Sequence, residues 1–277
     1  MLESLIARLR QGSRTLAFPD APPSLPERFR GLPRIQSAAC PPQCSLCAEA
    51  CPTEAIRIDA AGPRLDMGRC LFCTDCLQAC PTDALRFTDD YRLATRSREA
   101  LSVGPEVPEL AAALNREMLA LFGRSLKLRQ VSAGGCGGCE ADLNVLSTVV
   151  FDMGRFGVQF VASPRHADGL VITGAVSENM REALLRTRDA LPEPRLVIAV
   201  GACAISGGPF AGHPEVHDGA SELLPIDLYI PGCPPHPITI LDGLLRLLGR
   251  IQSGERPAAG PIAPLGLEAV AKAPASV

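Results

Sequence analysis

In CPPQCSLCAEACP (residues 40–52) four cysteines stand close together, and CLFCTDCLQACP (residues 70–81) shows nearly the same pattern again. Both stretches belong to a longer internal repeat. CSLCAEACPTEAIRI (residues 44–58) superposes on CTDCLQACPTDALRF (residues 73–87) at an offset of 29 residues, with eight of fifteen positions identical. Two copies of one unit predict a domain with pseudo-two-fold symmetry, which we place at residues 38–92.

The chain has 277 residues and twelve cysteines, and we expect these cysteines to bind metal. The first residues, MLESLIARLRQGSRT, hold no apolar run typical of a signal peptide and no twin-arginine pair, and no stretch reaches the roughly 18 to 20 apolar residues that span a bilayer. The expected location is therefore the cytoplasm, where thiols stay reduced and clustered cysteines are first interpreted as metal ligands. A formal net charge of -3 predicts no nucleic acid partner.

The segments around the repeat differ in character. Leu2, Leu5, Ile6 and Leu9 recur at helical spacing, so residues 1–37 are expected to hold a short amphipathic helix followed by a proline-rich linker from Phe18 to Pro33. Docking of that helix on its own chain or on a subunit is favoured over a membrane-surface position. Residues 93–124 are expected to form a second linker with a helix near 109–122, and residues 252–277, rich in Ala and Pro, a disordered tail.

From residue 125 to 251 short apolar runs alternate with helical patterns. The expected strands are LKLRQV (126–131), GVQFVA (157–162), GLVITG (169–174), RLVIAVG (195–201) and IDLYIPG (226–232). The expected helices lie at 141–152, 178–190 and 237–248. This alternation is typical of an α/β domain in which helices cover both faces of a parallel sheet.

The second cysteine stretch follows the spacing C-x-x-C-x-x-C-x-x-x-C-P, through Cys70, Cys73, Cys76 and Cys80. The short gaps allow three thiolates on one loop to reach three corners of a cubane cluster, while the fourth points to another cluster. Zinc also binds paired C-x-x-C units. Eight cysteines with interleaved spacing and two Cys-Pro endings fit zinc poorly.

This repeat resembles the bacterial two-cluster ferredoxins over about 50 residues, which implies an α+β ferredoxin-like domain with two 4Fe-4S clusters. By that resemblance the ligands of one cluster are Cys40, Cys44, Cys47 and Cys80, and those of the other are Cys70, Cys73, Cys76 and Cys51. Cys40 departs from the pattern, because three residues separate it from Cys44 where the family has two. Cys40 is therefore the ligand that the resemblance supports least directly.

The remaining four cysteines all follow expected strands. Glycines around Cys136 and Cys139 allow a close backbone approach to an inorganic core. The set occupies the carboxyl ends of strands, where open parallel sheets bind ligands, and consists of Cys136, Cys139, Cys203 and Cys233. A thioredoxin-like dithiol would also explain CGGC, but it leaves Cys203 and Cys233 without a role.

SPRHADGLVITGAVSENM, EPRLVIAVGACAISGGPF and LPIDLYIPGCPPHP resemble the small subunit shared by nickel-iron hydrogenases and respiratory complex I. The resemblance covers about residues 126–251 and implies a flavodoxin-like domain whose four cysteines bind the proximal 4Fe-4S cluster. Complex I members carry two adjacent cysteines where this chain has Cys136 and Cys139 spaced as C-x-x-C. They also usually carry a glutamine at the place where, in this chain, Arg165 is followed by His166. Both features resemble the energy-converting membrane-bound hydrogenases.

The chain thus resembles a fusion of two neighbouring subunits. The function implied is that of an iron-sulfur electron-transfer subunit with three 4Fe-4S clusters and no active site of its own. Its expected partners are a large hydrogenase-type or complex I-like subunit, integral membrane subunits and an external electron donor or acceptor, which would place it on the inner face of the cell membrane. The alternatives are a quinone or sulfur oxidoreductase subunit without nickel, and a free electron carrier.

A few other residues are candidates for a role at these sites. Glu140 could tune the adjacent cluster or be an acidic residue favoured at a helix N-terminus. Arg165 and His166 could donate to cluster sulfides or form surface ion pairs. His213 and His217 lie in a Gly- and Pro-rich stretch and are interpreted as solvated loop histidines. Glycine-rich loops carry cysteines here, so no nucleotide site is expected.

Overall fold

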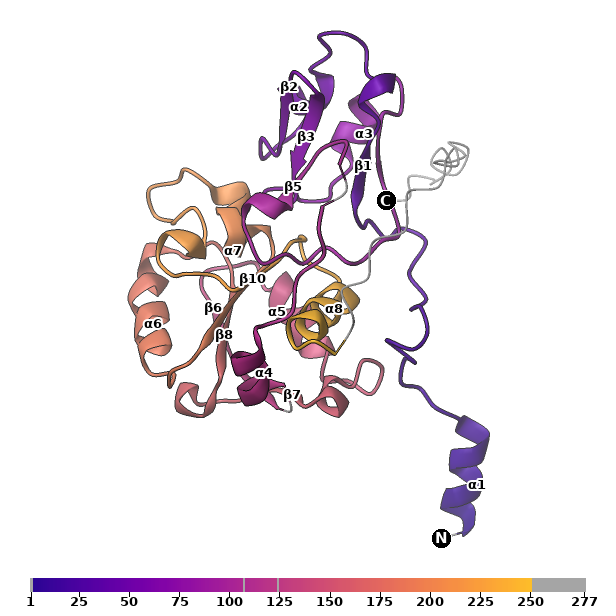
Figure 1. Ribbon diagram of the computed structural model, residues 1–277, viewed down its shortest axis with the longest axis vertical. Coiled ribbons are helices and arrows are strands. Elements are labelled where there is room, and N and C mark those ends of the chain that lie inside the picture. Colours follow the sequence, from indigo (N-terminus) through magenta and orange to yellow (C-terminus); the bar gives the residue numbers. More distant parts are fainter. Residues whose placement is uncertain (1, 107, 124, 251–277) are drawn as a thin grey trace, which may run out of the picture.

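The computed structural model describes residues 2–106, 108–123 and 125–250, so the expected tail at 252–277 lies outside the described residues. The chain forms two modules and an N-terminal helix that stands apart from both (Figure 1). That helix, α1, spans Leu2–Gln11, as the apolar spacing predicts. No helix within the described ranges is long and apolar enough to cross a membrane.

The cysteine repeat forms the first module, a small α+β unit. Helices α2 (Leu46–Glu49) and α3 (Asp75–Ala79) are each followed by a strand, β2 (Ile56–Asp59) and β4 (Leu85–Phe87) respectively. Strand β4 pairs antiparallel with β1 (Pro33–Ile35), and β2 pairs with β3 (Gly62–Asp66). Strand β3 also pairs with β5 (Ser102–Val103), so the module includes residues beyond the expected boundary at 92.

The second module is built on a five-stranded parallel sheet, with all five strands at their predicted positions. The order is β10-β9-β8-β6-β7, formed by β6 (Leu126–Ser132), β7 (Val158–Phe160), β8 (Gly169–Thr173), β9 (Leu196–Val200) and β10 (Leu228–Ile230). Its helices are α4 (Arg116–Phe122), α5 (Gly138–Val145), α6 (Glu178–Asp189), α7 (Ala202–Ser206) and α8 (Pro237–Leu247). Helices α6 and α8 lie on opposite sides of the sheet (Figure 1).

Two expected helices have different bounds. The helix expected at 109–122 begins only at Arg116, because Asn115 is its N-cap and accepts a hydrogen bond from the Met118 N-H. The helix expected at 141–152 spans Gly138–Val145 instead. The Thr148 hydroxyl donates to the Val145 carbonyl at 2.7 Å, and the chain turns there.

The segment from Phe18 to Pro33, expected to be a linker without packing of its own, has buried side chains in the structure. Phe18 is buried, and Leu32 is fully buried in the core. The Arg155 side chain donates to the Leu16 and Phe18 carbonyls. The prolines thus keep this segment extended while its apolar side chains pack on both modules.

The strands of the parallel sheet alternate between two cores. Leu170 and Ile172 of β8 face one core, and Val171 faces the other. The first of these cores is continuous with the interior of the cysteine-rich module and includes its Leu32 and Leu65. The two modules are therefore packed into one body.

Candidate metal centres

The repeat is preserved at the level of single hydrogen bonds. The Ala55 N-H donates to Cys51 Sγ at 3.2 Å, and 29 residues later the Ala84 N-H donates to Cys80 Sγ at 3.3 Å. Glu54 and Asp83, at equivalent positions, have φ values of +51° and +53°. The two CPT loops therefore present their sulfur atoms in the same way.

One set of four cysteines, which we call the second set, lines a single cavity: Cys51, Cys70, Cys73 and Cys76. Ile56, Leu65 and Phe87 contribute apolar walls. Burial raises the pKa of Cys70, and burial followed by the neighbouring Cys73 and Cys51 raises the pKa of Cys76 to about 12. The site offers four thiols around one apolar enclosure, which suits a sulfide-containing cluster.

The first set comprises Cys40, Cys44, Cys47 and Cys80, the four that the ferredoxin resemblance groups together. Burial and then Cys44 and Cys80 raise the pKa of Cys40, and burial and then Cys40 and Cys80 raise that of Cys47. Burial also raises the pKa of Cys80, but backbone N-H donors from Thr82 and Ala84 outweigh it and lower the net value. The structure thus brings the first-set thiols into electrostatic contact.

The extra residue before Cys44 is absorbed in a turn. Cys40 is extended, as a residue before proline should be, and the Cys44 N-H donates to the Pro41 carbonyl at 3.2 Å. Gln43 has a φ of +61°, and Phe72, its equivalent in the second copy, has a φ of +55°. The insertion therefore changes the approach of Cys40 and leaves the turn into Cys44 intact.

The third set consists of Cys136, Cys139, Cys203 and Cys233, which follow the carboxyl ends of β6, β9 and β10. The topology of the sheet reverses between β6 and β8, which is where open parallel sheets form a crevice. Burial, then Cys203, Glu140, Cys233 and Cys136, raise the pKa of Cys139. The four thiols thus lie together, and Cys203 and Cys233 accompany the CGGC pair that a dithiol interpretation would treat alone.

Gly201 makes this third set possible. Its φ is +88°, and a Cβ atom on it would lie 2.5 Å from Cys139 Sγ. Any other residue would meet both backbone strain and a collision with the thiol. The glycine at the end of β9 therefore provides room for Cys139 to reach the set.

Glu140 turns inward beside the third set. The Thr173 hydroxyl donates to Glu140 Oε1 at 2.7 Å. Burial raises the pKa of Glu140, but hydrogen bonds from Ser132 and Thr173 outweigh burial and lower the net pKa. The carboxylate is held in place by side chains at the ends of β6 and β8.

The other candidate residues lie elsewhere. Arg165 and His166 are exposed on a short 3-10 helix that precedes the first residue of β8, whereas the cysteines follow the last residues of strands. His217 Nε2 lies 2.8 Å from Glu178 Oε2, and His213 Nδ1 accepts from the Glu215 N-H. The structure therefore brings Glu140 to the third set, whereas Arg165 and His166 lie at the opposite end of β8, and His213 and His217 bond to Glu215 and Glu178.

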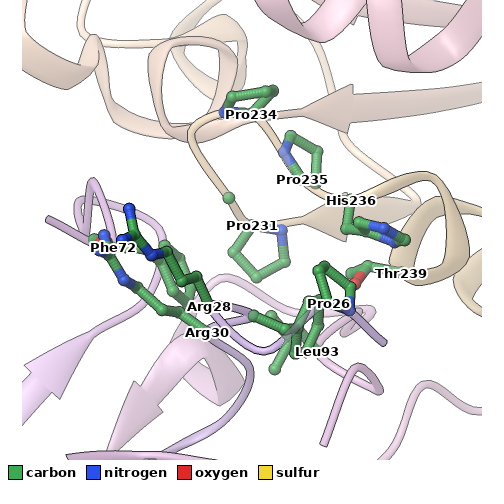
Figure 2. Close-up of a pocket in the computed structure, with 12 residues that line it drawn as sticks. Pro26, Arg28, Arg30, Phe72, Leu93, Pro231, Pro234, Pro235, His236 and Thr239 are labelled. Carbon is green, nitrogen blue, oxygen red and sulfur yellow. The ribbon is translucent and has the colours of Figure 1, made fainter. Parts of the chain in front are cut away.

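The second and third sets lie next to each other across the module boundary. Cys73 contributes to the raised pKa of Cys233, after burial and Cys136. A cavity of about 230 Å³ lies beside them, between Phe72 and the loop from Pro231 to His236 (Figure 2). Arg30 closes one side, and its Nη1 donates to the Phe72 carbonyl at 2.5 Å.

Within the described ranges, no three His, Cys, Asp or Glu side chains converge on a point that could hold one metal ion. In a 4Fe-4S cluster each thiolate binds a separate iron, so its four ligands need not meet at a point. The four thiols lining the second-set cavity have this wider arrangement.

Several polar residues at the boundary between the modules could not be identified from the sequence. Ser206 bonds across the module boundary, and Arg30 and the pair Asp66–Arg98 fix the loops beside it, yet each is a common polar residue outside any motif. Only the position of Ser206, three residues after Cys203, could have drawn attention to it.

Comparison with known proteins assigns both modules. Residues 39–84 match the 4Fe-4S dicluster domain, and residues 136–247 match the family described as NADH ubiquinone oxidoreductase, 20 Kd subunit. The chain is 39% identical over 160 residues to formate hydrogenlyase subunit 7 of Escherichia coli, a match that covers 58% of this chain and 63% of that protein.

Two further relatives are covered more completely. The probable membrane-bound hydrogenase subunit mbhJ of Pyrococcus furiosus is 37% identical over 51% of this chain and 86% of the relative. An NADH-quinone oxidoreductase subunit of Desulfovibrio desulfuricans is 38% identical over 54% of this chain and 80% of the relative.

Proposed function

We propose that this chain, which belongs to the family of the NADH ubiquinone oxidoreductase 20 kDa subunit, carries electrons through three 4Fe-4S clusters to or from the active site of a partner subunit. The family and the dicluster domain support 4Fe-4S binding and a place in an oxidoreductase complex. The number of clusters, their ligands and the reaction of the complex are the proposal.

The donor sets support three clusters. Each set offers four thiols, and the cavity of the second set is enclosed by apolar side chains. Raised thiol pKa values mean that the metal must displace protons to bind, which couples loading to pH. Bound clusters would supply one-electron transfer, and the cysteines and their N-H donors hold them and tune their potentials.

The order of the sets supports a single path. Cys47 of the first set contributes to the raised pKa of Cys76 in the second set, after burial, Cys73 and Cys51. Cys73 of the second set contributes in the same way to the raised pKa of Cys233 in the third set. The second set is therefore central. Cys136 and Cys233 are exposed, so the third set lies at a surface that a partner subunit could cover.

The fold is consistent with a flavodoxin-like second module. When its strands are counted from β6, the sheet order is 2-1-3-4-5, which is the flavodoxin order. We propose module limits of 38–92, extended by the β5 pairing, and 125–251, joined by residues 93–124. Glu140 is the residue we propose to tune the third cluster, because its carboxylate is fixed beside Cys139.

Hydrogen chemistry is the reaction we favour for the complex. Relatives with hydrogenase or hydrogenlyase names match this chain, and Cys136 and Cys139 have the C-x-x-C spacing of membrane-bound hydrogenases. The partners proposed are a large subunit with nickel, integral membrane subunits and an external electron carrier, with this chain bound on the cytoplasmic face. The NADH-quinone oxidoreductase relatives favour a quinone-linked complex as the second candidate.

The test is anaerobic purification of the native complex through a tag on this chain. We expect a large subunit and membrane proteins to co-purify, with nickel present and hydrogen turnover with a viologen dye. This chain alone should bind about 12 iron and show no hydrogen activity. A complex without nickel and without hydrogen activity would overturn the hydrogenase assignment and favour the quinone-linked candidate.

A further inference from the structure

The turn from Asp66 to Cys70, which we call the 66–70 turn, delivers Cys70 to the second set and is internally fixed. The Asp66 carbonyl accepts hydrogen bonds from the Arg69 and Cys70 N-H groups, each at 3.1 Å. Asp66 Oδ1 accepts from the Gly68 N-H at 2.9 Å. The position of Cys70 therefore follows that of the whole turn.

Arg98 ties the 66–70 turn to the parallel sheet. Its Nη1 lies 2.7 Å from Asp66 Oδ1 and its Nη2 lies 2.5 Å from Asp66 Oδ2, a bidentate pair with a defined orientation. Three residues earlier, Thr95 exchanges two backbone hydrogen bonds with Tyr229 of β10, at 3.0 and 2.8 Å. Arg98 therefore contacts the turn from a segment that is attached at Thr95 to the parallel sheet and at β5 to β3 of the first module.

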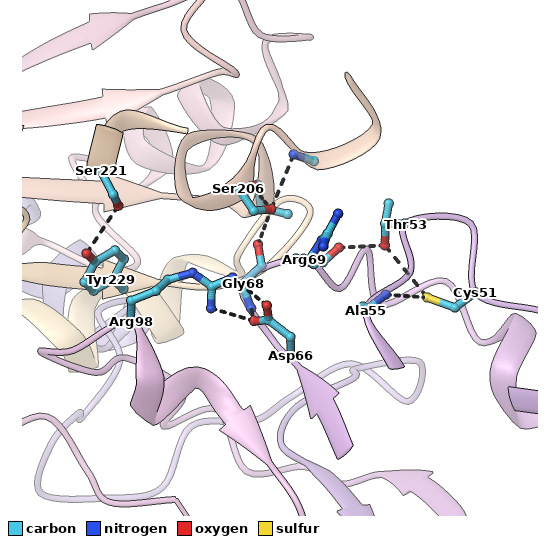
Figure 3. Close-up of polar contacts among 12 residues, drawn as sticks. Cys51, Thr53, Ala55, Asp66, Gly68, Arg69, Arg98, Ser206, Ser221 and Tyr229 are labelled. Carbon is cyan, nitrogen blue, oxygen red and sulfur yellow. Dashed lines mark hydrogen bonds and ion pairs between the residues drawn. The ribbon is translucent and has the colours of Figure 1, made fainter. Parts of the chain in front are cut away.

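Helix α7, which carries Cys203, contacts the other side of the turn (Figure 3). Ser206 Oγ donates to the Gly68 carbonyl at 2.9 Å and lies 3.1 Å from the Ala202 carbonyl in its own helix. A Cβ atom on Gly68 would lie 2.7 Å from Ile205 Cγ2 and 3.0 Å from the Arg98 guanidinium. The backbone at Gly68 is thus in direct contact with the helix that holds a third-set cysteine.

The same turn also touches the CPT loop of the second set. The Thr53 hydroxyl donates to the Arg69 carbonyl at 2.8 Å, and Thr53 Oγ1 lies 3.8 Å from Cys51 Sγ. A chain of contacts therefore runs from Ser206 on α7 through Gly68 and Arg69 of the turn to Thr53 and Cys51 (Figure 3).

We propose that Ser206, acting with Arg98 on the 66–70 turn, is a positioning residue that sets the spacing between the second and third cysteine sets. The inference rests on the proposed function, because the spacing matters only if both sets hold clusters. Electron tunnelling falls steeply with distance, so a helix and a turn pinned together keep the step between modules fast without a mobile joint. None of the pinning groups is itself a proposed ligand.

The experiment uses the full chain, loaded anaerobically with iron and sulfide, as wild type, Ser206→Ala and Gly68→Ala. Iron content and the spin-spin splitting between the reduced clusters of the second and third sets are measured by metal analysis and paramagnetic resonance. Ser221→Ala is the matched control, because the Ser221 hydroxyl pairs with the Tyr229 hydroxyl at 3.3 Å, a contact within the second module.

We expect both Ser206→Ala and Gly68→Ala to keep the iron content of wild type and to show a smaller splitting, while Ser221→Ala keeps the splitting. An unchanged splitting in Ser206→Ala would overturn the inference and leave the proposed function standing. Loss of second-set iron in Ser206→Ala would also overturn it, because Ser206 would then be needed for the second set to bind its cluster and not for the distance between the two sets. A wild-type chain with no third cluster would instead remove the proposed function.

Discussion

At Gly201 the chain passes from β9 into α7 with a φ of +88°, and the Sγ atom of Cys139 occupies the space that a side chain would need. We expect Gly201→Ala to displace Cys139 and to lose the third cluster, so that iron falls from about 12 to about 8 per chain. Metal analysis and paramagnetic resonance of the loaded chain measure the loss.

Gly212→Ala separates collision from backbone strain. Gly212 has a φ of +78°, but nothing lies within 4 Å of the Cβ that would be added. This variant should destabilise slightly, by about 1 kcal/mol for an alanine at positive φ, and keep all its iron. Equal iron loss in both variants would show that strain, and not the contact with Cys139, limits position 201.

At the residue scale, the cysteines could be predicted as ligands because they form recognisable sequence motifs. The ferredoxin resemblance implied the first two sets, and the places of four cysteines after strands suggested the third. In the structure, thiols within each set raise one another's pKa, and all twelve stay predicted ligands. The partners of Glu140 could not be predicted, since Ser132 and Thr173 come near it only through the pairing of β6 with β8. Cys40 stays a predicted ligand, now with its thiol placed beside Cys44 and Cys80.

At the scale of elements, the start of α8 depends on a neutral histidine. His236 is the N-cap, and its Nδ1 accepts the Ile238 N-H at 3.2 Å. Burial lowers the pKa of His236, and the residues lining the adjacent cavity include no carboxylate. Protonation would remove the acceptor and place a charge in a partly buried site.

The sign of the resulting pH dependence follows from the lowered pKa. The folded state binds fewer protons than the unfolded state, whose histidine titrates near 6.5, so stability is complete above about pH 6.5 and decreases as the pH falls below it. We expect His236→Asn to keep the cap and to flatten the decrease in melting temperature between about pH 7 and pH 5.5. Anaerobic thermal melts across this range measure it.

Two controls complete this experiment. His236→Ala should lower stability by about 1 kcal/mol above about pH 6.5, because the cap is lost, and this difference from wild type should shrink as the pH falls. His166→Asn removes an exposed histidine and should leave the pH slope unchanged. A steep slope that persists in His236→Asn would assign the pH dependence to another group.

Helices and strands could be predicted where the apolar pattern of the sequence was strong. They could not be predicted where tertiary contacts determine the backbone conformation. The five strands of the parallel sheet are continuous apolar runs, and each appears where expected. Residues 109–115 have helical composition, but Ala111 and Leu114 are buried in an extended segment that packs beside α8, and the Leu114 N-H donates to the Leu247 carbonyl. Tertiary packing there overrides local helix preference.

At the scale of the whole molecule, the sequence suggested two modules joined by linkers, and the structure shows one shared core. Leu65 and Met67 of the first module belong to the same buried cluster as Leu170 and Ile205 of the second. Local patterns identify which residues are buried but not which module covers them. The packing of the two modules against each other therefore could not be predicted from the sequence.

A shared core predicts that the modules lose structure together. Ile205 on α7 is 2% exposed and meets the backbone of Gly68 across the boundary. Ile205→Ala should therefore cost about 2 to 5 kcal/mol. Hydrogen exchange followed by mass spectrometry should show faster exchange in β3 of the first module as well as in β8 of the second.

Ile58→Ala is the matched control, since Ile58 is 41% exposed on β2. It should change stability by no more than about 0.5 kcal/mol and leave exchange in both strands near wild type. Two independent modules on a tether would respond differently: Ile205→Ala would then accelerate exchange in β8 and leave β3 unchanged. Joint acceleration is expected because the side chain removed from α7 supports the 66–70 turn directly, and β3 ends at Asp66, the residue from which that turn begins.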